Sequence, residues 1–163
     1  MFKLKELIGE LKKSDNYKKF SKENPDSFVC AGFFVLDFEE NKDKYQLDIF
    51  VPSKKKVAIS EFPFKEIKMQ EDKMDNAESI ENLKLSLDLP NLEEKVGKLK
   101  EENEVKHKTS KIIAILKDKE WNLTCFSNTM DITRIKIDAE TGECKKFERA
   151  NLMEFIRLEK GKK

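Results

Sequence analysis

The stretch from Trp121 to Phe147 constrains the fold of this chain more than any other segment. It holds two amphipathic runs, then the turn sequence Asp138-Ala139-Glu140-Thr141-Gly142-Glu143, and then a third run. Alternation of apolar and polar residues is the period of a half-buried strand. Asp and Thr side chains bond local backbone in tight turns, and Gly readily supplies a positive φ. The segment therefore predicts antiparallel strands joined by a tight turn.

Length and charge set the next bounds. The chain has 163 residues, the size of one domain or of two small domains that share an interface. Its 33 Lys and Arg nearly cancel its 32 Asp and Glu, and only three of the cationic residues are Arg. A net charge of +1 gives no long-range attraction to phosphate, and Arg is the side chain best shaped to recognise phosphate and bases. We expect no nucleic-acid partner.

The first half of the chain predicts a helix followed by three strands. Apolar residues recur at helical spacing from Phe2 to Phe20, and the turn sequence Asn24-Pro25-Asp26 ends that pattern. The first strand pattern, Phe28–Phe38, is almost continuously apolar, which indicates burial on both faces of the sheet or a bulge at Gly32. The three strand patterns are Phe28–Phe38, Tyr45–Val51 and Val57–Phe62. Residues 63–79 are polar and patternless, so we expect a connector.

The second half repeats this order after a short strand. Leucines alternate with polar residues from Leu83 to Leu89, and the sequence Asn91-Leu92-Glu93-Glu94 then resembles a capping box that begins a helix reaching about Glu104. Strand patterns follow at Ile112–Leu116, Trp121–Phe126, Ile132–Asp138 and Cys144–Glu148, and a short helical turn is expected at Asn151–Leu158. The sequence thus predicts an α+β fold in which antiparallel meander sheets are each covered by a helix. Two tandem repeats are expected, at residues 1–79 and 80–163.

Residues 91–148 resemble a PepSY-type domain. The family has a helix, a hairpin with an aromatic residue in its second strand, and a strand that ends in Asp-x-x-Thr-Gly-Glu. The matching residues here are Trp121, Ile135, Ile137, Asp138, Thr141, Gly142 and Glu143. The first half matches only in the order of its elements, because Pro52-Ser53-Lys54-Lys55-Lys56 stands between its strands. The resemblance implies a noncatalytic, cystatin-like module that contacts a protein partner, often a peptidase or a membrane-associated system.

Few residues carry catalytic or metal-binding chemistry. His107 is the only histidine and stands between two lysines, so we expect a solvated surface side chain. Acidic clusters are interleaved with Lys, and five scattered Gly form no phosphate-binding loop. Cys30, Cys125 and Cys144 have no CxxC spacing and are expected to be buried thiols. We therefore expect no enzyme activity, no metal and no cofactor.

The location expected for this chain is the cytoplasm. The residues that begin the sequence are charged, and no apolar run has the length of a signal-peptide core or a membrane span. The PepSY-type family is commonly exported, so the family and this expectation differ. Removal of a signal peptide from a longer chain would change the prediction.

Three functional hypotheses follow. The first is a noncatalytic protein-binding or regulatory module that uses an exposed sheet face or edge, with an unidentified protein or a second copy of the chain as partner. Its candidate surface residues are Phe33, Phe50, Trp121 and Phe126. The alternative is a domain that binds a small apolar ligand in a pocket lined by Phe28, Phe33, Phe34, Phe38 and Phe50. The third, an enzyme, would need carboxylates and Tyr17 or Tyr45 to converge in a cleft.

Overall fold

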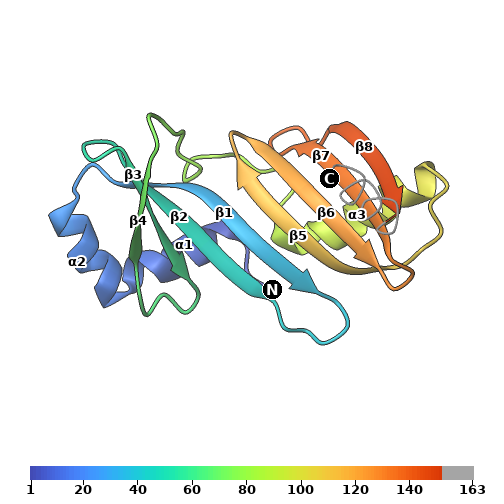
Figure 1. The fold of residues 1–163 in the computed structure, drawn as a ribbon, viewed down its shortest axis with the longest axis horizontal. Coiled ribbons are helices and arrows are strands. Elements are labelled where there is room, and N and C mark those ends of the chain that lie inside the picture. Colours follow the sequence, from blue (N-terminus) through green and yellow to red (C-terminus); the bar gives the residue numbers. More distant parts are fainter. Residues whose placement is uncertain (152–163) are drawn as a thin grey trace, which may run out of the picture.

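A computed structural model describes residues 1–151, which form one antiparallel eight-stranded sheet and three α-helices (Figure 1). The helices are α1 Leu4–Lys13, α2 Asp15–Glu23 and α3 Leu92–Glu102, the last preceded by the 3-10 turn η1 Leu89–Asn91. The strands are β1 Phe28–Asp37, β2 Lys44–Val51, β3 Lys56–Glu61, β4 Lys68–Lys73, β5 Thr109–Lys117, β6 Glu120–Ser127, β7 Asp131–Asp138 and β8 Cys144–Asn151. The predicted α+β class with antiparallel strands is confirmed.

The strands run in the order β4-β3-β2-β1-β5-β6-β7-β8. Each half of the chain therefore forms a meander, and the two meanders join where β1 pairs antiparallel with β5. At this junction Phe33 lies opposite Ile115, and Val35 lies opposite Ile113. One continuous sheet results, with β4 and β8 at its edges.

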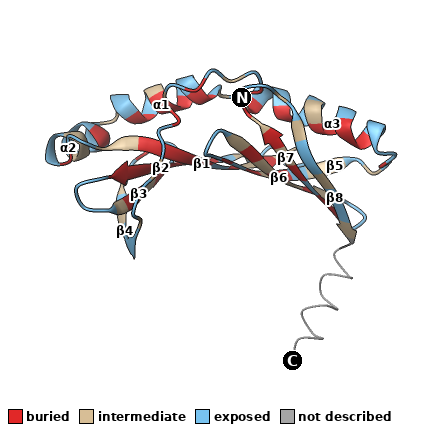
Figure 2. Ribbon diagram, turned by 90° about the horizontal axis from the view of Figure 1, so that it is seen from above, coloured by how far each residue is buried: buried red, intermediate tan, exposed pale blue. Residues whose placement is uncertain are grey.

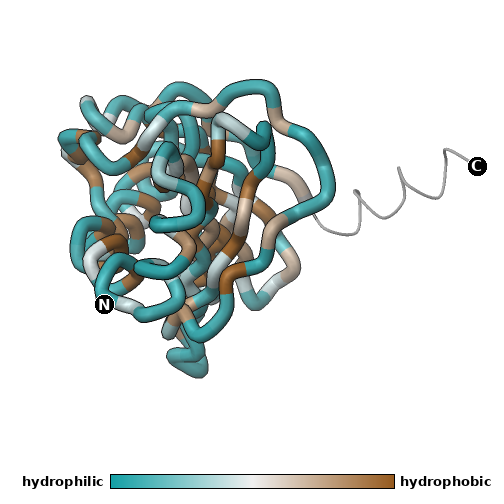
Figure 3. Tube along the Cα trace, turned by 90° about the vertical axis from the view of Figure 1, so that its left-hand side faces the viewer, coloured by the Kyte–Doolittle hydropathy of each residue, from teal (hydrophilic) through white to brown (hydrophobic). Residues whose placement is uncertain are grey.

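All three helices lie on one side of the sheet, which curves away from them at both edges (Figure 2). Helix α1 buries Leu4, Leu7 and Leu11 at helical spacing, and α3 buries Leu92, Val96 and Leu99. These side chains belong to the same core cluster as the inward-facing strand residues, including Trp121 and Phe34. Hydrophobic segments lie mainly in the middle of the fold, and the segments around them are largely hydrophilic (Figure 3). The opposite sheet face has no helix over it in the described part of the chain.

The predicted first helix is in fact two. Ser14 has extended backbone, with φ −67° and ψ 144°, and separates α1 from α2. Its Oγ accepts a hydrogen bond of 3.2 Å from the backbone N–H of Tyr17 and so caps α2. Serine is a favoured N-cap residue, so the break had a sequence signal that the apolar spacing concealed.

Two predictions near the centre of the chain are wrong. The expected connector contains β4, an edge strand whose polar side chains meet solvent and therefore show no apolar alternation. The expected strand at Leu83–Leu89 is irregular backbone, although Leu83, Leu87 and Leu89 are all buried in the core. Both errors have one cause. Alternation of apolar and polar residues indicates which side chains are exposed, but it does not show whether the backbone pairs with a neighbouring strand.

Other details agree or differ by a residue or two. The expected bulge at Gly32 lies instead between Val29 and Ala31, where the β1–β2 register shifts. In the β7–β8 turn, Asp138 Oδ1 accepts hydrogen bonds of 2.9 Å from the N–H groups of Glu140 and Thr141, and Gly142 has φ +79°. These backbone bonds also hold the pKa of Asp138 below its usual value. The expected helical turn at Asn151–Leu158 lies outside the described residues, except that Asn151 ends β8.

Candidate functional site

The structure separates the four predicted surface residues. Phe33 is 37% exposed and Phe126 is half-buried. Phe50 is buried, because its ring meets that of Phe28 edge to face, with centroids 5.7 Å apart, in a small cluster that Met74 and Ala77 also contact. Phe33 and Phe126 therefore remain candidates for a contact surface, and Phe50 does not.

Trp121 is also buried, so its placement on an exposed surface was wrong. It has no exposed area, lies 6.0 Å from the ring of Phe34, and donates from Nε1 to the carbonyl of Leu87 at 2.8 Å. The ring faces the helices because Trp121 alternates with Asn122 on β6. Its aromatic character serves the core.

An apolar patch occupies the middle of the helix-free face. We define the open-face patch as Phe33, Val35, Ile113 and Ile115. These residues alternate along β1 and β5 with the buried core residues, and Ile115 is 36% exposed. Because Phe33 pairs with Ile115 and Val35 with Ile113, the four side chains form two adjacent rows on one face. The patch therefore straddles the junction of the two meanders.

Polar and cationic residues border the open-face patch. Gln46 lies opposite Phe33 on β2, and Lys44 lies opposite Val35. On the other side Asn122 lies opposite Ile115, with Lys136 of β7 next in the same row. An apolar centre with a polar and charged rim is the usual anatomy of a protein contact surface.

The sheet edges are less suited to binding. Edge strand β4 has the sequence KMQEDK, and charged side chains on an edge oppose pairing with another strand. On β8, Lys145, Lys146 and Glu148 are exposed. Of the two surfaces expected from sequence, the face is therefore the better supported.

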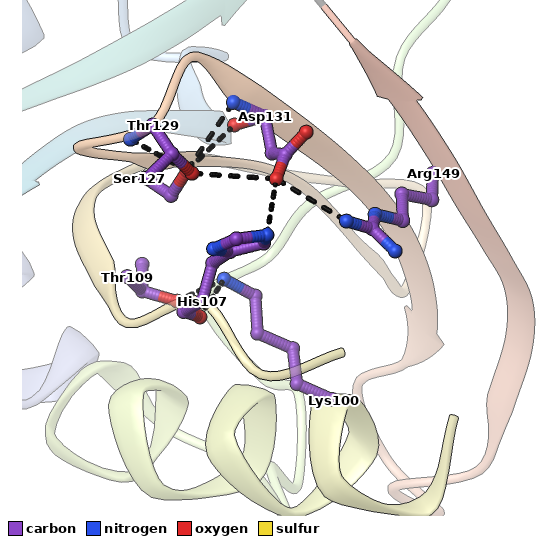
Figure 4. A network of polar contacts seen from close by, with 7 residues as sticks. All are labelled: Lys100, His107, Thr109, Ser127, Thr129, Asp131 and Arg149. Atoms are coloured by element: carbon purple, nitrogen blue, oxygen red, sulfur yellow. Dashed lines mark hydrogen bonds and ion pairs between the residues drawn. The ribbon is translucent and has the colours of Figure 1, made fainter. Parts of the chain in front are cut away.

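A second notable arrangement is a polar network around Asp131 at the start of β7 (Figure 4). Its Oδ2 lies 2.9 Å from His107 Nε2, 3.2 Å from Arg149 Nη2 and 3.3 Å from Thr129 Oγ1. The carboxylate is largely buried, with 12% of the side chain exposed. It connects the loop after α3 with β7 and β8. The prediction of a freely solvated His107 is wrong, because the fold brings a distant carboxylate to it.

Lys100 lies beneath this network on α3. Its Nζ donates to Thr109 Oγ1 at 2.6 Å and to the carbonyl oxygen of His107 at 3.3 Å. Only 5% of the residue is exposed. Burial lowers the pKa of Lys100, since removal from water disfavours the ammonium. Within residues 1–151 no carboxylate lies at ion-pair distance from this ammonium.

The same residues border a cavity of about 980 Å³. One face of α3, Phe38 and the loop 105–109, which ends at the first residue of β5, line it. Of the five phenylalanines expected to line one pocket, only Phe38 does so here. Phe34 is in the core and Phe33 is on the opposite sheet face. The phenylalanines thus do not share this cavity, which gives the predicted Phe-lined pocket no support.

The residues named for catalysis and metal binding are dispersed. Tyr45 donates to Asp43 Oδ2 at 3.3 Å, and burial raises its pKa to about 12. Tyr17 is buried beside α1, and neither tyrosine lines the large cavity. Among residues 1–151 no group of three His, Cys, Asp or Glu side chains is arranged to hold a metal ion. Cys30 and Cys125 are buried as expected, whereas Cys144 is half-buried.

Comparison with known proteins adds a fold relationship. No protein-family model matches the chain, and a search of curated proteins finds no relative. The structure resembles a crystal structure of a candidate lipoprotein from Clostridium difficile 630, with a TM-score of 0.50 and 16% sequence identity. The match covers 83% of this chain and 91% of that one. At this identity the likeness describes the fold. In the described residues, no helix has the length and apolar character needed to cross a bilayer.

Proposed function

We propose that this protein is a noncatalytic binding module that contacts a protein partner through the open-face patch. The observation that carries the proposal is the cross-strand pair of Phe33 and Ile115, two large apolar side chains exposed side by side. Burying them against a partner would remove apolar area from water. The neighbouring Lys44 and Lys136 favour a partner surface that is apolar at its centre and acidic at its margin.

A second part of the proposal concerns internal repetition in the fold. We infer that the two halves are tandem helix-plus-meander repeats and that the second is PepSY-like. The strand order supports this, because it reads the same outward from the β1–β5 junction in both directions. The Asp138 turn is consistent with the family resemblance, and its hydrogen bonds also follow from turn chemistry alone. On this basis the patch sits where the repeats meet.

Two locations are compatible with such a module. The buried free thiols of Cys30 and Cys125 favour a reducing compartment such as the cytoplasm, whereas the structural neighbour is described as a candidate lipoprotein. We propose the cytoplasm for this chain. Immunoblotting of fractionated cells of the source organism tests this directly, and recovery in the membrane fraction would reverse it.

The binding proposal is tested with two double variants. Phe33→Ser with Ile115→Ser removes the centre of the patch. Phe62→Ser with Met130→Ser removes two exposed apolar residues elsewhere and serves as the matched control. Each protein is immobilised and exposed to native lysate, and the captured proteins are quantified against wild type.

We expect at least one protein to fall by about tenfold or more with the patch variant and to stay at wild-type level with the control. Circular dichroism and urea unfolding establish that both variants remain folded. Capture of the same proteins in the same amounts by all three would overturn the proposal.

A further inference from the structure

The cavity beside α3 has the features of an anion-binding site with an apolar wall. Its volume of about 980 Å³ is at the upper end of the range typical of small-molecule sites. Phe38 and Val105 supply an apolar wall, and the exposed main chain at Gly97 borders it. No Cβ at Gly97 would meet a neighbour within 4 Å, so this part of the wall is open.

Lys100 gives the cavity a buried positive charge. Its ammonium has three donors, and the hydrogen bonds to Thr109 Oγ1 and to the His107 carbonyl occupy two of them. Both hydrogen-bond acceptors are neutral, and Asp131, which attracts this ammonium electrostatically, makes no direct ion pair with it. A ligand carboxylate would form that direct ion pair by accepting a hydrogen bond from the third donor.

The surrounding charges limit the class of ligand. Glu93, Glu101 and Glu104 are exposed at the α3 side of the cavity, and Lys106 and Lys108 are exposed on the loop side. The three carboxylates would repel a ligand with several negative charges, such as a nucleotide. A single carboxylate experiences less of this repulsion and is attracted by the buried ammonium. An apolar chain attached to it would lie against Phe38 and Val105.

We propose that this cavity binds a monocarboxylate with an apolar body, with Lys100 as the residue that holds the carboxylate. The site is separate from the open-face patch, because its lining residues are on α3 and the loop 105–109. The inference does not rest on the proposed protein-binding function.

Decanoate is a suitable probe, and decanol is its neutral counterpart. Binding is measured by isothermal titration and by chemical-shift changes in a ¹⁵N-labelled sample. We expect saturable decanoate binding with shifts at α3 and residues 105–109. Lys100→Met keeps the aliphatic stem and removes the charge, so it should weaken decanoate binding by about tenfold or more and leave decanol binding unchanged.

Lys98→Met is the matched control, since Lys98 is exposed on the same helix and does not line the cavity. A second test fills the cavity with Gly97→Leu, for which Gly9→Leu on α1 is the control. Gly97→Leu should weaken both probes, and Gly9→Leu neither. This second pair decides the question if Lys100→Met fails to fold.

Three results would overturn the proposal. They are the absence of saturable decanoate binding to wild type, equal binding by the Lys100 and Lys98 variants, and shift changes confined to the open-face patch. A loss of stability in Lys100→Met without loss of decanoate affinity would make Lys100 a purely structural residue. None of these results bears on partner capture by the patch.

Discussion

Trp121 Nε1 donates a hydrogen bond of 2.8 Å to the backbone carbonyl of Leu87, 34 residues away in sequence. The hydrogen bond links the irregular segment that precedes η1 to the sheet, because Trp121 lies on β6. Leu87 is buried in the same core as Trp121. This contact explains why a segment without strand pairing remains ordered: its leucines are buried and a carbonyl it must satisfy has a partner.

Trp121→Phe tests the contribution of that bond. The change leaves the buried Leu87 carbonyl without its donor and removes one ring, so we expect a loss of about 1–3 kcal/mol in the free energy of unfolding. Urea unfolding followed by circular dichroism measures it, because Trp121 is the only tryptophan. Phe126→Leu, at a half-buried site on the same strand, is the control and should cost less. Equal losses would mean that the indole N–H contributes little.

Local structure could be predicted from the sequence more accurately than the exposure of individual side chains. The hairpin strands and the Asp138 turn were predictable because alternation and turn chemistry act between near neighbours. Trp121 and Phe50 were misplaced because the same alternation leaves open which face of a strand is covered. That choice depends on where α1, α3 and the segment containing Met74 pack, and these contacts are distant in sequence.

The candidate sites show the same limit. Phe33 was identified as a surface candidate, but its pairing with Ile115 depends on the β1–β5 junction, which no local pattern reveals. His107 and Asp131 are 24 positions apart and meet only when the loop after α3 reaches β7. Lys100 lies in an amphipathic helix among other lysines, so its sequence context gave no sign of burial.

Asp88 should stabilise two helical ends at once. Its Oδ1 accepts from the N–H of Leu4 at 2.9 Å, at the start of α1, and from the N–H of Leu89 at 2.7 Å, in η1. Asp88→Ala should lower the free energy of unfolding by about 1–2 kcal/mol. Asp88→Asn keeps the acceptor oxygen and should recover most of the loss. Urea unfolding of both variants measures these changes. Equal losses of stability in the two variants would show that the charge of Asp88 matters, and not its acceptor oxygen.

Asp131 and His107 should be energetically coupled. A double-mutant cycle with Asp131→Asn and His107→Gln isolates their interaction from the other contacts of each residue. We expect a favourable coupling of about 0.5–1 kcal/mol, because the carboxylate is largely buried while the imidazole is partly solvated. Additive effects of the two substitutions in urea unfolding would show that the other contacts of Asp131 satisfy its carboxylate without His107.

Gly32 and Gly9 should respond oppositely to alanine. A Cβ at Gly32 would lie 2.3 Å from the ring of Phe34, which is fully buried, so the ring would have to shift within the core. Gly32→Ala should therefore destabilise the fold by about 1–3 kcal/mol. Gly9 is in α1 with nothing near its added Cβ, so Gly9→Ala should stabilise by about 0.5–1 kcal/mol. Thermal unfolding of both variants checks the signs, and a stable Gly32→Ala would show that Phe34 can repack.

Alkaline pH should destabilise the fold through its buried thiols. Burial raises the pKa of Cys125, and likewise of Cys30, from 9.0 to about 12. The unfolded thiol therefore loses its proton above pH 9 while the folded one keeps it, so the unfolded state binds fewer protons and stability falls as pH rises. This stability is fully present below the unfolded pKa and is lost towards pH 12, at about 1.4 kcal/mol per pH unit for each thiol.

Urea unfolding under reducing conditions, from about pH 8 to about pH 11, measures this dependence. Cys125→Ala should lose stability at neutral pH through the vacated volume, yet show a shallower decline at alkaline pH than wild type. Ile135→Val truncates another core side chain without removing an ionisable group, and its decline should stay parallel to wild type. Lys100 changes stability with pH in the opposite direction. Because its pKa is lowered in the folded state, its contribution makes stability rise with pH up to about 10.5. The comparison of variants over the same pH range isolates the thiol, and an unchanged slope in Cys125→Ala would show that its thiol ionises in the folded state.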